Sequence, residues 1–188
     1  NTLVGYLSGG DIADGGDNVC VGDMTMVNGT GSQNVVIGSG AGSSNQNGTS
    51  TQFTGGVNVL IGYSAGNDLT NGPGNVLIGA SAGADMTTSS YNVAIGYQAM
   101  DLSTTLQQNN IAIGKNALGG NATEPSGATI NSIAIGTEAL LVQNNAAAIN
   151  TAIGYQAGKA ITSGSQNVLI GYQAGSTIVD DNYNTALG

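Results

Sequence analysis

Few residues of this 188-residue chain are of the types that catalyse reactions. The chain has no histidine, no arginine and one cysteine, Cys20, and its only cationic side chains are Lys115 and Lys159. A Ser-His-Asp or Cys-His arrangement is therefore impossible within it. Glu124 and Glu138 are the only glutamates, and no carboxylate pair recurs in the way that glycoside hydrolysis requires. We expect no catalytic residue and no cofactor, so the chain is predicted not to be an enzyme.

Two other patterns are candidates for small-ligand sites. Asp11, Asp14 and Asp17 lie close together in sequence, and Ca²⁺ binds through several oxygen ligands. The Gly-Gly-x-Gly-x-Asp pattern of calcium-binding β-rolls is absent, so solvated turns are the preferred interpretation and a metal site the weaker one. Residues 38–42 (Gly-Ser-Gly-Ala-Gly) follow an apolar run as a phosphate-binding loop does, but no helix pattern comes after them. We interpret them as part of a repeat.

Composition and charge narrow the classes of partner. The net charge of −9, with two lysines, argues against a nucleic-acid partner, because binding phosphates requires a stripe of basic residues. No apolar run approaches the roughly 20 residues of a membrane span, so no membrane insertion is expected. The chain begins and ends within a repeat, at Asn1 and Gly188, which suggests a segment of a longer fibre. Cys20 is expected to be a small buried core residue.

A short motif recurs along the whole chain. It consists of Asn, three apolar residues and Gly, often followed by Tyr-Gln-Ala-Gly, as in residues 167–175. The packet glycine occurs eleven times, and the spacings are 17, 16, 24, 17, 17, 18, 22, 18, 17 and 17 residues. The basic period is therefore 17 residues, with insertions at 43–56 and 119–128. We treat residues 1–188 as one repeat domain.

The positions of the motif predict its structure. Three apolar residues, of which the first is always β-branched, followed by Gly, are typical of a short strand that ends in a turn. A second apolar residue follows the packet glycine by seven positions at Ile12, Leu69, Met86, Ile161 and Ile178. The opening Asn suits a tight corner, and stacked copies would form a ladder of asparagines. The sequence thus predicts an all-β, parallel β-solenoid or β-roll of about eleven coils.

Strand alternation leads to a prediction of self-association. If the first and third apolar residues of each packet fill the coil, the residue between them must face outward. An outward row of Leu and Ala is too apolar for water, and another copy of the chain is its simplest cover. The predicted contact between copies comprises Leu60, Leu77, Ala94, Ala112, Ala134, Ala152 and Leu169. A monomer with a wide core at that point is the alternative.

The motif also resembles repeats of known families. Residues 131–136 (Asn-Ser-Ile-Ala-Ile-Gly) look like the head repeat of trimeric autotransporter adhesins, which are left-handed parallel β-rolls with three chains around one axis. Residues 150–158 (Asn-Thr-Ala-Ile-Gly-Tyr-Gln-Ala-Gly) are similar to repeats in tail-fibre and structural proteins of tailed bacteriophages, notably marine ones. The resemblance covers essentially the whole chain. It implies a homotrimer, and the long period and the Tyr-Gln-Ala-Gly tail favour the phage-type fibre.

Three further surface features are candidates for ligand binding. Five tyrosines follow a packet glycine and either stack along the rod or contact a ligand: Tyr6, Tyr63, Tyr97, Tyr155 and Tyr172. Thr70, Thr87 and Thr162 share a row that hints at an ice-binding face, although the row is not sustained. The two insertions are candidate binding loops, because insertions leave a solenoid on one face.

We therefore expect a structural and adhesive segment of an extracellular fibre. The first hypothesis is a bacteriophage tail fibre, on the virion, involved in attachment to a glycan or protein of the host cell surface. The alternative is the head of a trimeric adhesin on a bacterial cell surface. A self-assembling extracellular filament and an ice-binding solenoid are further alternatives.

Overall fold

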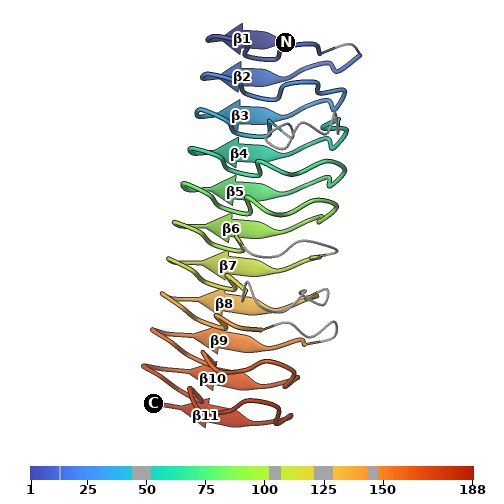
Figure 1. The fold of residues 1–188 in the computed structure, drawn as a ribbon. Helices are drawn as coiled ribbons and strands as arrows, with labels where there is room; N and C mark the ends of the chain where they lie inside the picture. Colours follow the sequence, from blue (N-terminus) through green and yellow to red (C-terminus); the bar gives the residue numbers. More distant parts are fainter. Residues whose placement is uncertain (13, 44–51, 102–106, 121–128, 144–147) are drawn as a thin grey trace.

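The protein is a parallel β-solenoid in which eleven three-residue strands form one sheet along its length (Figure 1). The computed structural model describes residues 1–12, 14–43, 52–101, 107–120, 129–143 and 148–188. The strands are β1 (Thr2–Val4), β2 (Val19–Val21), β3 (Val35–Ile37), β4 (Val59–Ile61), β5 (Val76–Ile78), β6 (Val93–Ile95), β7 (Ile111–Ile113), β8 (Ile133–Ile135), β9 (Thr151–Ile153), β10 (Val168–Ile170) and β11 (Thr185–Leu187). Each strand pairs in parallel with the next, in the order of the sequence.

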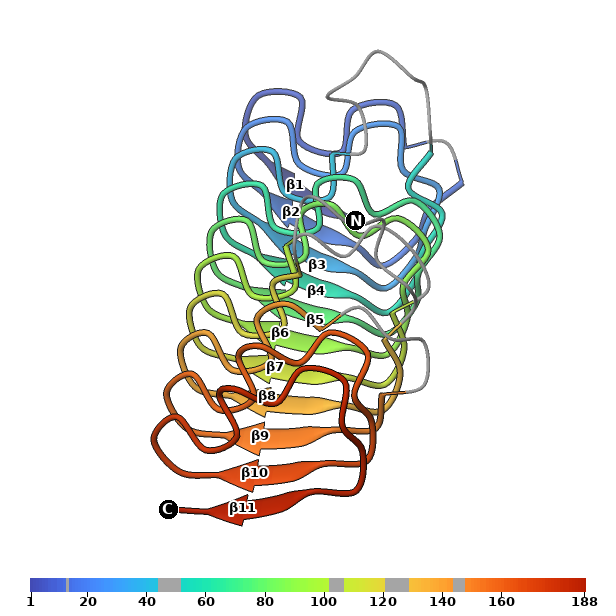
Figure 2. The ribbon, with the colours of Figure 1, turned by 60° about the horizontal axis from the view of Figure 1, so that its bottom comes forward.

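The predicted repeat is confirmed in its period and its register. Equivalent packet residues are aligned across every pair of strands, as in Val59 with Val76 and Ile61 with Ile78. The solenoid has about nine turns and a period of about 17 residues, slightly fewer turns than the eleven coils predicted. Seen toward its end, the strands form one wall and turns close the other sides (Figure 2). The described residues contain no helix, and thus none long and apolar enough to cross a membrane.

The asparagine that opens each packet forms the predicted ladder inside the solenoid. The Oδ1 atom of Asn58 accepts hydrogen bonds from the backbone N–H of Asn75, at 2.8 Å, and from its side-chain amide, at 3.2 Å. The Asn75 amide also donates to the carbonyl of Ser89, at 2.8 Å, in the following turn. The same bonds repeat along the sheet, and these asparagines are almost fully buried. The ladder therefore pairs the polar groups of a corner that water cannot reach.

The ladder continues through the one described packet that opens with serine. Ser132 donates its backbone N–H to the Oδ1 of Asn110, at 2.9 Å, as an asparagine there would do. Its short side chain cannot make the next bonds alone, and the buried Gln143 supplies the missing amide. Gln143 donates to the Ser132 hydroxyl, at 3.1 Å, and accepts from the amide of Asn150, at 3.0 Å. Gln143, which belongs to the same turn, thus supplies the hydrogen bonds that Ser132 lacks.

The buried ladder shows that the predicted facing of the strand residues was wrong. The middle residues expected to point outward are in the core and have no exposed surface: Leu60, Leu77, Ala94, Ala112, Ala134, Ala152 and Leu169. The first and third residues, such as Val76 and Ile78, face outward instead. Because each ladder Asn points inward, alternation places the second residue after it, the middle residue, inward as well. The predicted contact between copies through the middle residues is therefore wrong, because these side chains are not exposed.

Most turns place one large core side chain at one of two positions. Where the middle strand residue is Leu, as at Leu77, the fourth residue after the packet glycine is Gly, and the leucine lies over it. Where the middle residue is small, a large residue takes the fourth position in four turns; Ala152 with Gly158 is the exception, and Leu140 and Leu169 of the neighbouring turns lie over Gly158. The pairs are Cys20 with Met26, Ala94 with Met100, Ala112 with Leu118, and Ala134 with Leu140, and all are buried. Of the predicted second apolar residues, Leu69, Met86 and Ile161 are fully buried. Ile12 and Ile178 are partly buried and pack against the core.

The packet glycines stack directly upon one another where each strand turns. Their φ angles lie between +116° and +139°, a region that residues with a Cβ rarely adopt. A Cβ added at Gly79 would lie 2.4 Å from the carbonyl oxygen of Gly96, the equivalent glycine of the next turn. Both backbone conformation and lack of space therefore require glycine here.

Replacement of Gly79 by alanine tests this constraint. We expect Gly79→Ala to destabilise the protein by at least about 2 kcal/mol, because the backbone must move and neighbouring turns must separate. The matched control is Gly16→Ala, since a Cβ at Gly16 meets nothing within 4 Å. The control should change stability by less than about 0.5 kcal/mol. Denaturant midpoints followed by far-UV circular dichroism measure both, and equal effects would contradict the stacking argument.

A double-mutant cycle tests the exchange of volume in the core. Leu77→Ala should cost about 2–5 kcal/mol, because it leaves a cavity, and Gly83→Met alone should cost about 1–3 kcal/mol through overpacking. Together they recreate the arrangement of Ala94 and Met100, and Met100 already adopts the positive φ of this position, +56° against +58° at Gly83. The double variant should recover much of the stability lost by Leu77→Ala. Additive losses would show that the two positions do not share one volume.

Candidate functional site

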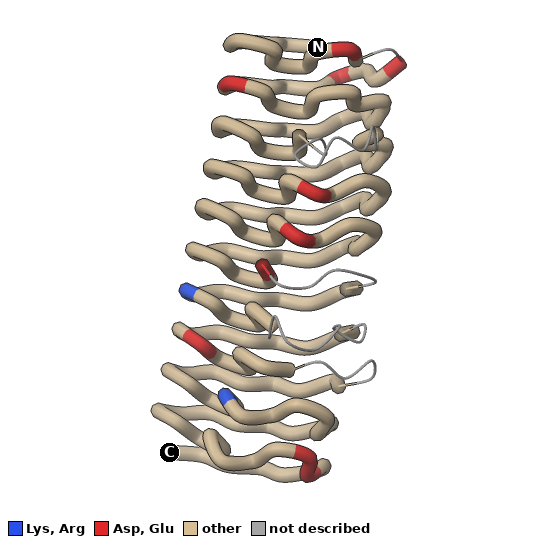
Figure 3. The backbone as a smooth tube through the Cα atoms, viewed as in Figure 1, with Lys and Arg blue, Asp and Glu red and all other residues tan. Residues whose placement is uncertain are grey.

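An extended apolar surface of the described protein is the outer face of the sheet. The first and third residues of every strand point outward and form two rows of mostly Val and Ile along all eleven strands. They are partly exposed: Ile37 retains 36% of its accessible surface and Ile170 retains 38%. No strand contains a charged residue, and Figure 3 shows the charged residues at corners and connections only. We call these two rows the outer sheet face.

The predicted tyrosine row borders the outer sheet face where the strands end. Tyr6, Tyr63, Tyr97, Tyr155 and Tyr172 are all exposed. Tyr155 and Tyr172, which belong to consecutive turns, stack with ring centroids 5.4 Å apart and an interplanar angle of 13°. Stacking along the rod is thus confirmed for this pair. Tyr63 and Tyr97 are separated by a turn that carries Ala80 in the same position, and their rings remain accessible.

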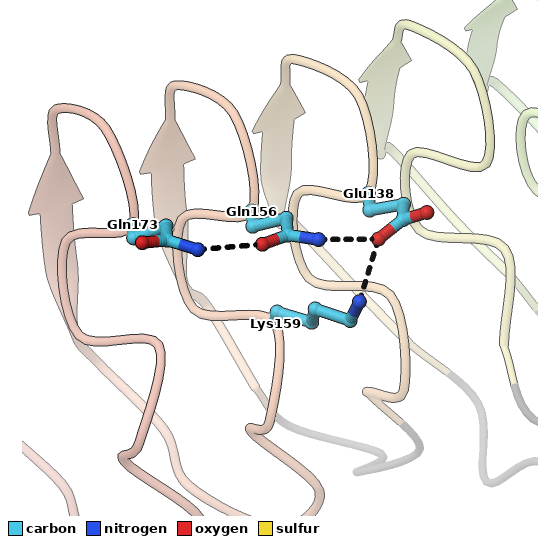
Figure 4. Close-up of polar contacts among 4 residues, drawn as sticks. All are labelled: Glu138, Gln156, Lys159 and Gln173. Atoms are coloured by element: carbon cyan, nitrogen blue, oxygen red, sulfur yellow. Dashed lines mark hydrogen bonds and ion pairs between the residues drawn. The ribbon is translucent and has the colours of Figure 1, made fainter.

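A row of polar side chains joins three consecutive turns toward the C-terminal end (Figure 4). The Gln173 amide donates to Gln156 at 2.8 Å, and the Gln156 amide donates to Glu138 at 2.8 Å. Lys159 forms an ion pair with the same Glu138 oxygen at 2.6 Å. Hydrogen bonds from Lys159 and Gln156 lower the pKa of the Glu138 carboxyl. These groups bond one another in a continuous row, which stabilises the corner without leaving an obvious reactive group.

Three aspartates follow one another in neighbouring turns on another side of the solenoid. Burial, and then the charge of Asp85, raise the pKa of Asp101 to about 6. Burial also raises the pKa of Asp68, and burial with the charge of Asp68 raises that of Asp85. Asp101 lines a cavity of about 110 Å³ together with Asn116, whose buried Oδ1 has no hydrogen-bond donor among the described residues. Gln98, Asp101 and Asn116 supply polar groups to its lining, and it is large enough for a few water molecules.

The small-ligand candidates from the sequence do not form sites in the described structure. Asp11, Asp14 and Asp17 are exposed, and the described residues contain no group of three or more His, Cys, Asp or Glu that could hold a metal ion. In residues 38–42, the N–H groups of Gly40, Ala41 and Gly42 donate to backbone carbonyls rather than to an open loop centre. Cys20 is fully buried, as predicted, and burial raises its pKa to about 11, which keeps the thiol protonated.

The threonine row is used in internal bonding. The hydroxyl of Thr70 donates to the carbonyl of Thr87 at 3.0 Å, and that of Thr162 donates to Asp180 at 2.8 Å. These hydroxyls join turns to one another and do not form a regular outward array. Of the two insertions, residues 44–51 and 121–128 lie outside the described residues, so the binding-loop interpretation stays a prediction.

The candidate functional surface that the sequence did not locate is the outer sheet face. Its residues were recognised as strand positions, but they were assigned to the interior. The signal that locates them is the polar Asn before each strand, whose burial sets the phase of alternation. Comparison with known proteins adds no further identification: no family model, curated protein or solved structure matches the chain.

The pH dependence of stability tests the aspartate row. Because the pKa of Asp101 in the folded state is about 6, above its usual value, the folded protein binds more protons than the unfolded chain between about pH 4 and 6. The free energy of unfolding should therefore fall as pH rises through this window. Asp101→Asn removes this loss and should be more stable than the original protein at pH 7.5, by roughly 1–2 kcal/mol.

The control for this experiment is Asp180→Asn. Hydrogen bonds from Ser163 and Thr162 lower the pKa of Asp180, so its ionised form is favoured in the folded state. Its replacement should not stabilise the protein at pH 7.5. Thermal melts between pH 4 and 8 measure the three proteins, and a pH profile unchanged by Asp101→Asn would contradict the burial argument.

Proposed function

We propose that this chain is a stiff, non-enzymatic segment of an extracellular fibre that assembles as a homotrimer through its outer sheet face. The observation that carries the proposal is the double row of outward side chains, mostly Val and Ile, that is free of charge along every strand. A contiguous apolar surface of this kind marks an interaction site. Since the chain carries a net charge of −9, the uncharged face is also where copies approach with least repulsion.

The size of the face suits a partner that runs parallel to the whole rod. With a strand spacing of about 4.8 Å and a strand width of about 10 Å, eleven strands present roughly 500 Å² in projection. Stable interfaces bury about 800 Å² per partner, so a partner must also cover one or both edges. A second and third copy around one axis satisfy this requirement, because each copy then contacts two neighbours.

The setting that we propose is a bacteriophage tail fibre that takes part in attachment to the host cell. The resemblance of residues 150–158 to repeats of such proteins supports this setting. The architecture is suited to a mechanical role, because every turn is bonded to the next by the sheet and by the asparagine ladder. Attachment to a surface glycan or protein would then belong to exposed corners or to the inserted residues, since the outer sheet face is occupied by other copies.

Sedimentation velocity with a face variant tests the proposal. We expect the unmodified chain to sediment as a trimer, and Ile78→Lys to sediment as a folded monomer, because three buried lysine charges would meet at one level of the axis. Asn71→Lys, at an exposed turn away from the sheet, adds the same charge and should leave the trimer intact. A monomeric unmodified chain, or dissociation by both variants, would contradict assembly through the outer sheet face.

A further inference from the structure

The outer sheet face has two edges, and strained apolar residues lie on one of them. The residue before each ladder Asn, or before Ser132, adopts a positive φ, between +44° and +73°. Asn, Asp and Gly accept this conformation readily, and several turns use them. Val57 and Ile149 are β-branched and adopt it at +60° and +44°, although their side chains are 62% and 48% exposed. An exposed and strained apolar side chain gains little within its own chain, which points to a contact outside it.

The opposite edge carries the tyrosine row, and the two edges match turn by turn. Val57, Tyr91 and Ile149 are apolar on the first edge, and the same turns carry Tyr63, Tyr97 and Tyr155 on the second. Most other turns are polar or small at both edges: Asp17 with Asp23, Gln33 with Ser39, Gly74 with Ala80, Asn109 with Lys115, and Asn131 with Thr137. Gln166 with Tyr172 departs from the pattern.

No contact within one copy couples the two residues of a matched pair. The paired residues are six positions apart across a strand, which separates their Cα atoms by roughly 15–20 Å. They lie at the same height on the rod but on opposite edges, so their side chains do not meet. A contact between the edge of one copy and the opposite edge of a neighbour would couple them directly.

We infer that the copies pack parallel and in register, so that Val57 of one copy contacts Tyr63 of the next. The inference rests on the proposed self-association. Rotation about an axis parallel to the rod keeps every turn at its height, and it brings the first edge of one copy to the second edge of its neighbour. An antiparallel arrangement, or a slip by one turn, would pair turns that do not match.

A hollow borders the second edge beside Tyr63, and in-register packing places Val57 of the neighbouring copy at its Tyr63 rim and Gln33 at the height of Gly40. A depression of about 340 Å³ lies beside Tyr63 and is lined by Leu7, Met24, Ser39 and Gly40 among others, with no charged side chain. It exists because Gly40 occupies a position where the adjacent turns carry Met24 and Ser64. Since the rows of Val and Ile are nearly identical at every turn, a hollow confined to a few turns distinguishes one register from another, which the periodic face itself does not.

Disulfide cross-linking of the full chain tests the register. The variant Val57→Cys/Tyr63→Cys cannot close a bond within one copy, because a disulfide requires Cα atoms within about 7 Å. Mild oxidation should therefore give covalent dimers and trimers on a non-reducing gel. The control Val57→Cys/Tyr97→Cys pairs turns at different heights and should give none, and the buried Cys20 is common to both. Products from the control pair, or from Val57→Cys alone, would overturn the parallel in-register arrangement.

A second variant separates this inference from the proposed function. Val57→Asn introduces the residue that Asn109 and Asn131 provide at the same position, and so relieves the strained φ. It should leave a folded chain whose copies associate about tenfold more weakly, as expected for the loss of one apolar contact in each interface. Gln166→Asn, at the same position of another turn, should leave the association unchanged.

The outcomes distinguish the two claims. An unmodified chain that is monomeric in sedimentation would remove the proposed function, and the inference with it. A trimer that fails to cross-link between residues 57 and 63, or that associates equally well with Val57→Asn, would overturn only the register inferred here.

Discussion

The structure depends on the burial of one polar side chain per turn. Most ladder asparagines accept two hydrogen bonds from the next one and donate to a backbone carbonyl, in a corner with almost no access to water. An unpaired amide there would cost about 1–3 kcal/mol, so each turn is stable only when its neighbour is in register. The repair at Ser132 by Gln143 shows how strictly the corner must be satisfied. Neighbouring turns thus stabilise one another because their buried polar groups must be paired, as well as because their apolar side chains are buried.

The same asparagines decide which strand residues are buried. A three-residue strand has either one or two residues inside, and apolar content alone does not select between them. With Asn58 inside, Leu60 must also be inside, and Val59 and Ile61 must face out. The solenoid interior is consequently narrow, which explains why each turn tolerates one large residue at either the strand or the following bend. The β-branched residues, which suit an extended strand, are left on the surface where a partner can cover them.

Surface and core therefore follow different rules along the rod. In the core, a small residue at one position of a turn is offset by a large residue at another. Leu77 with Gly83 and Ala94 with Met100 thus fill similar volumes. The outer sheet face repeats almost without variation, and its edges carry the differences between turns. Reactive groups are few and are mostly engaged, as in the row from Gln173 to Glu138. Such a distribution suits a structural segment in which the turns differ from one another mainly at their corners.

The sequence by itself determined the period, the strand positions, the asparagine ladder and the thin chemical inventory. These features depend on residue type at a fixed spacing, and every copy of the motif repeats them. Only the tertiary structure decided which face of each strand is buried, since the facing depends on the direction of the asparagine side chain relative to the coil. It also placed the hollow beside Tyr63 and the exposure of Val57, because both arise from turns that are distant in sequence and adjacent in space.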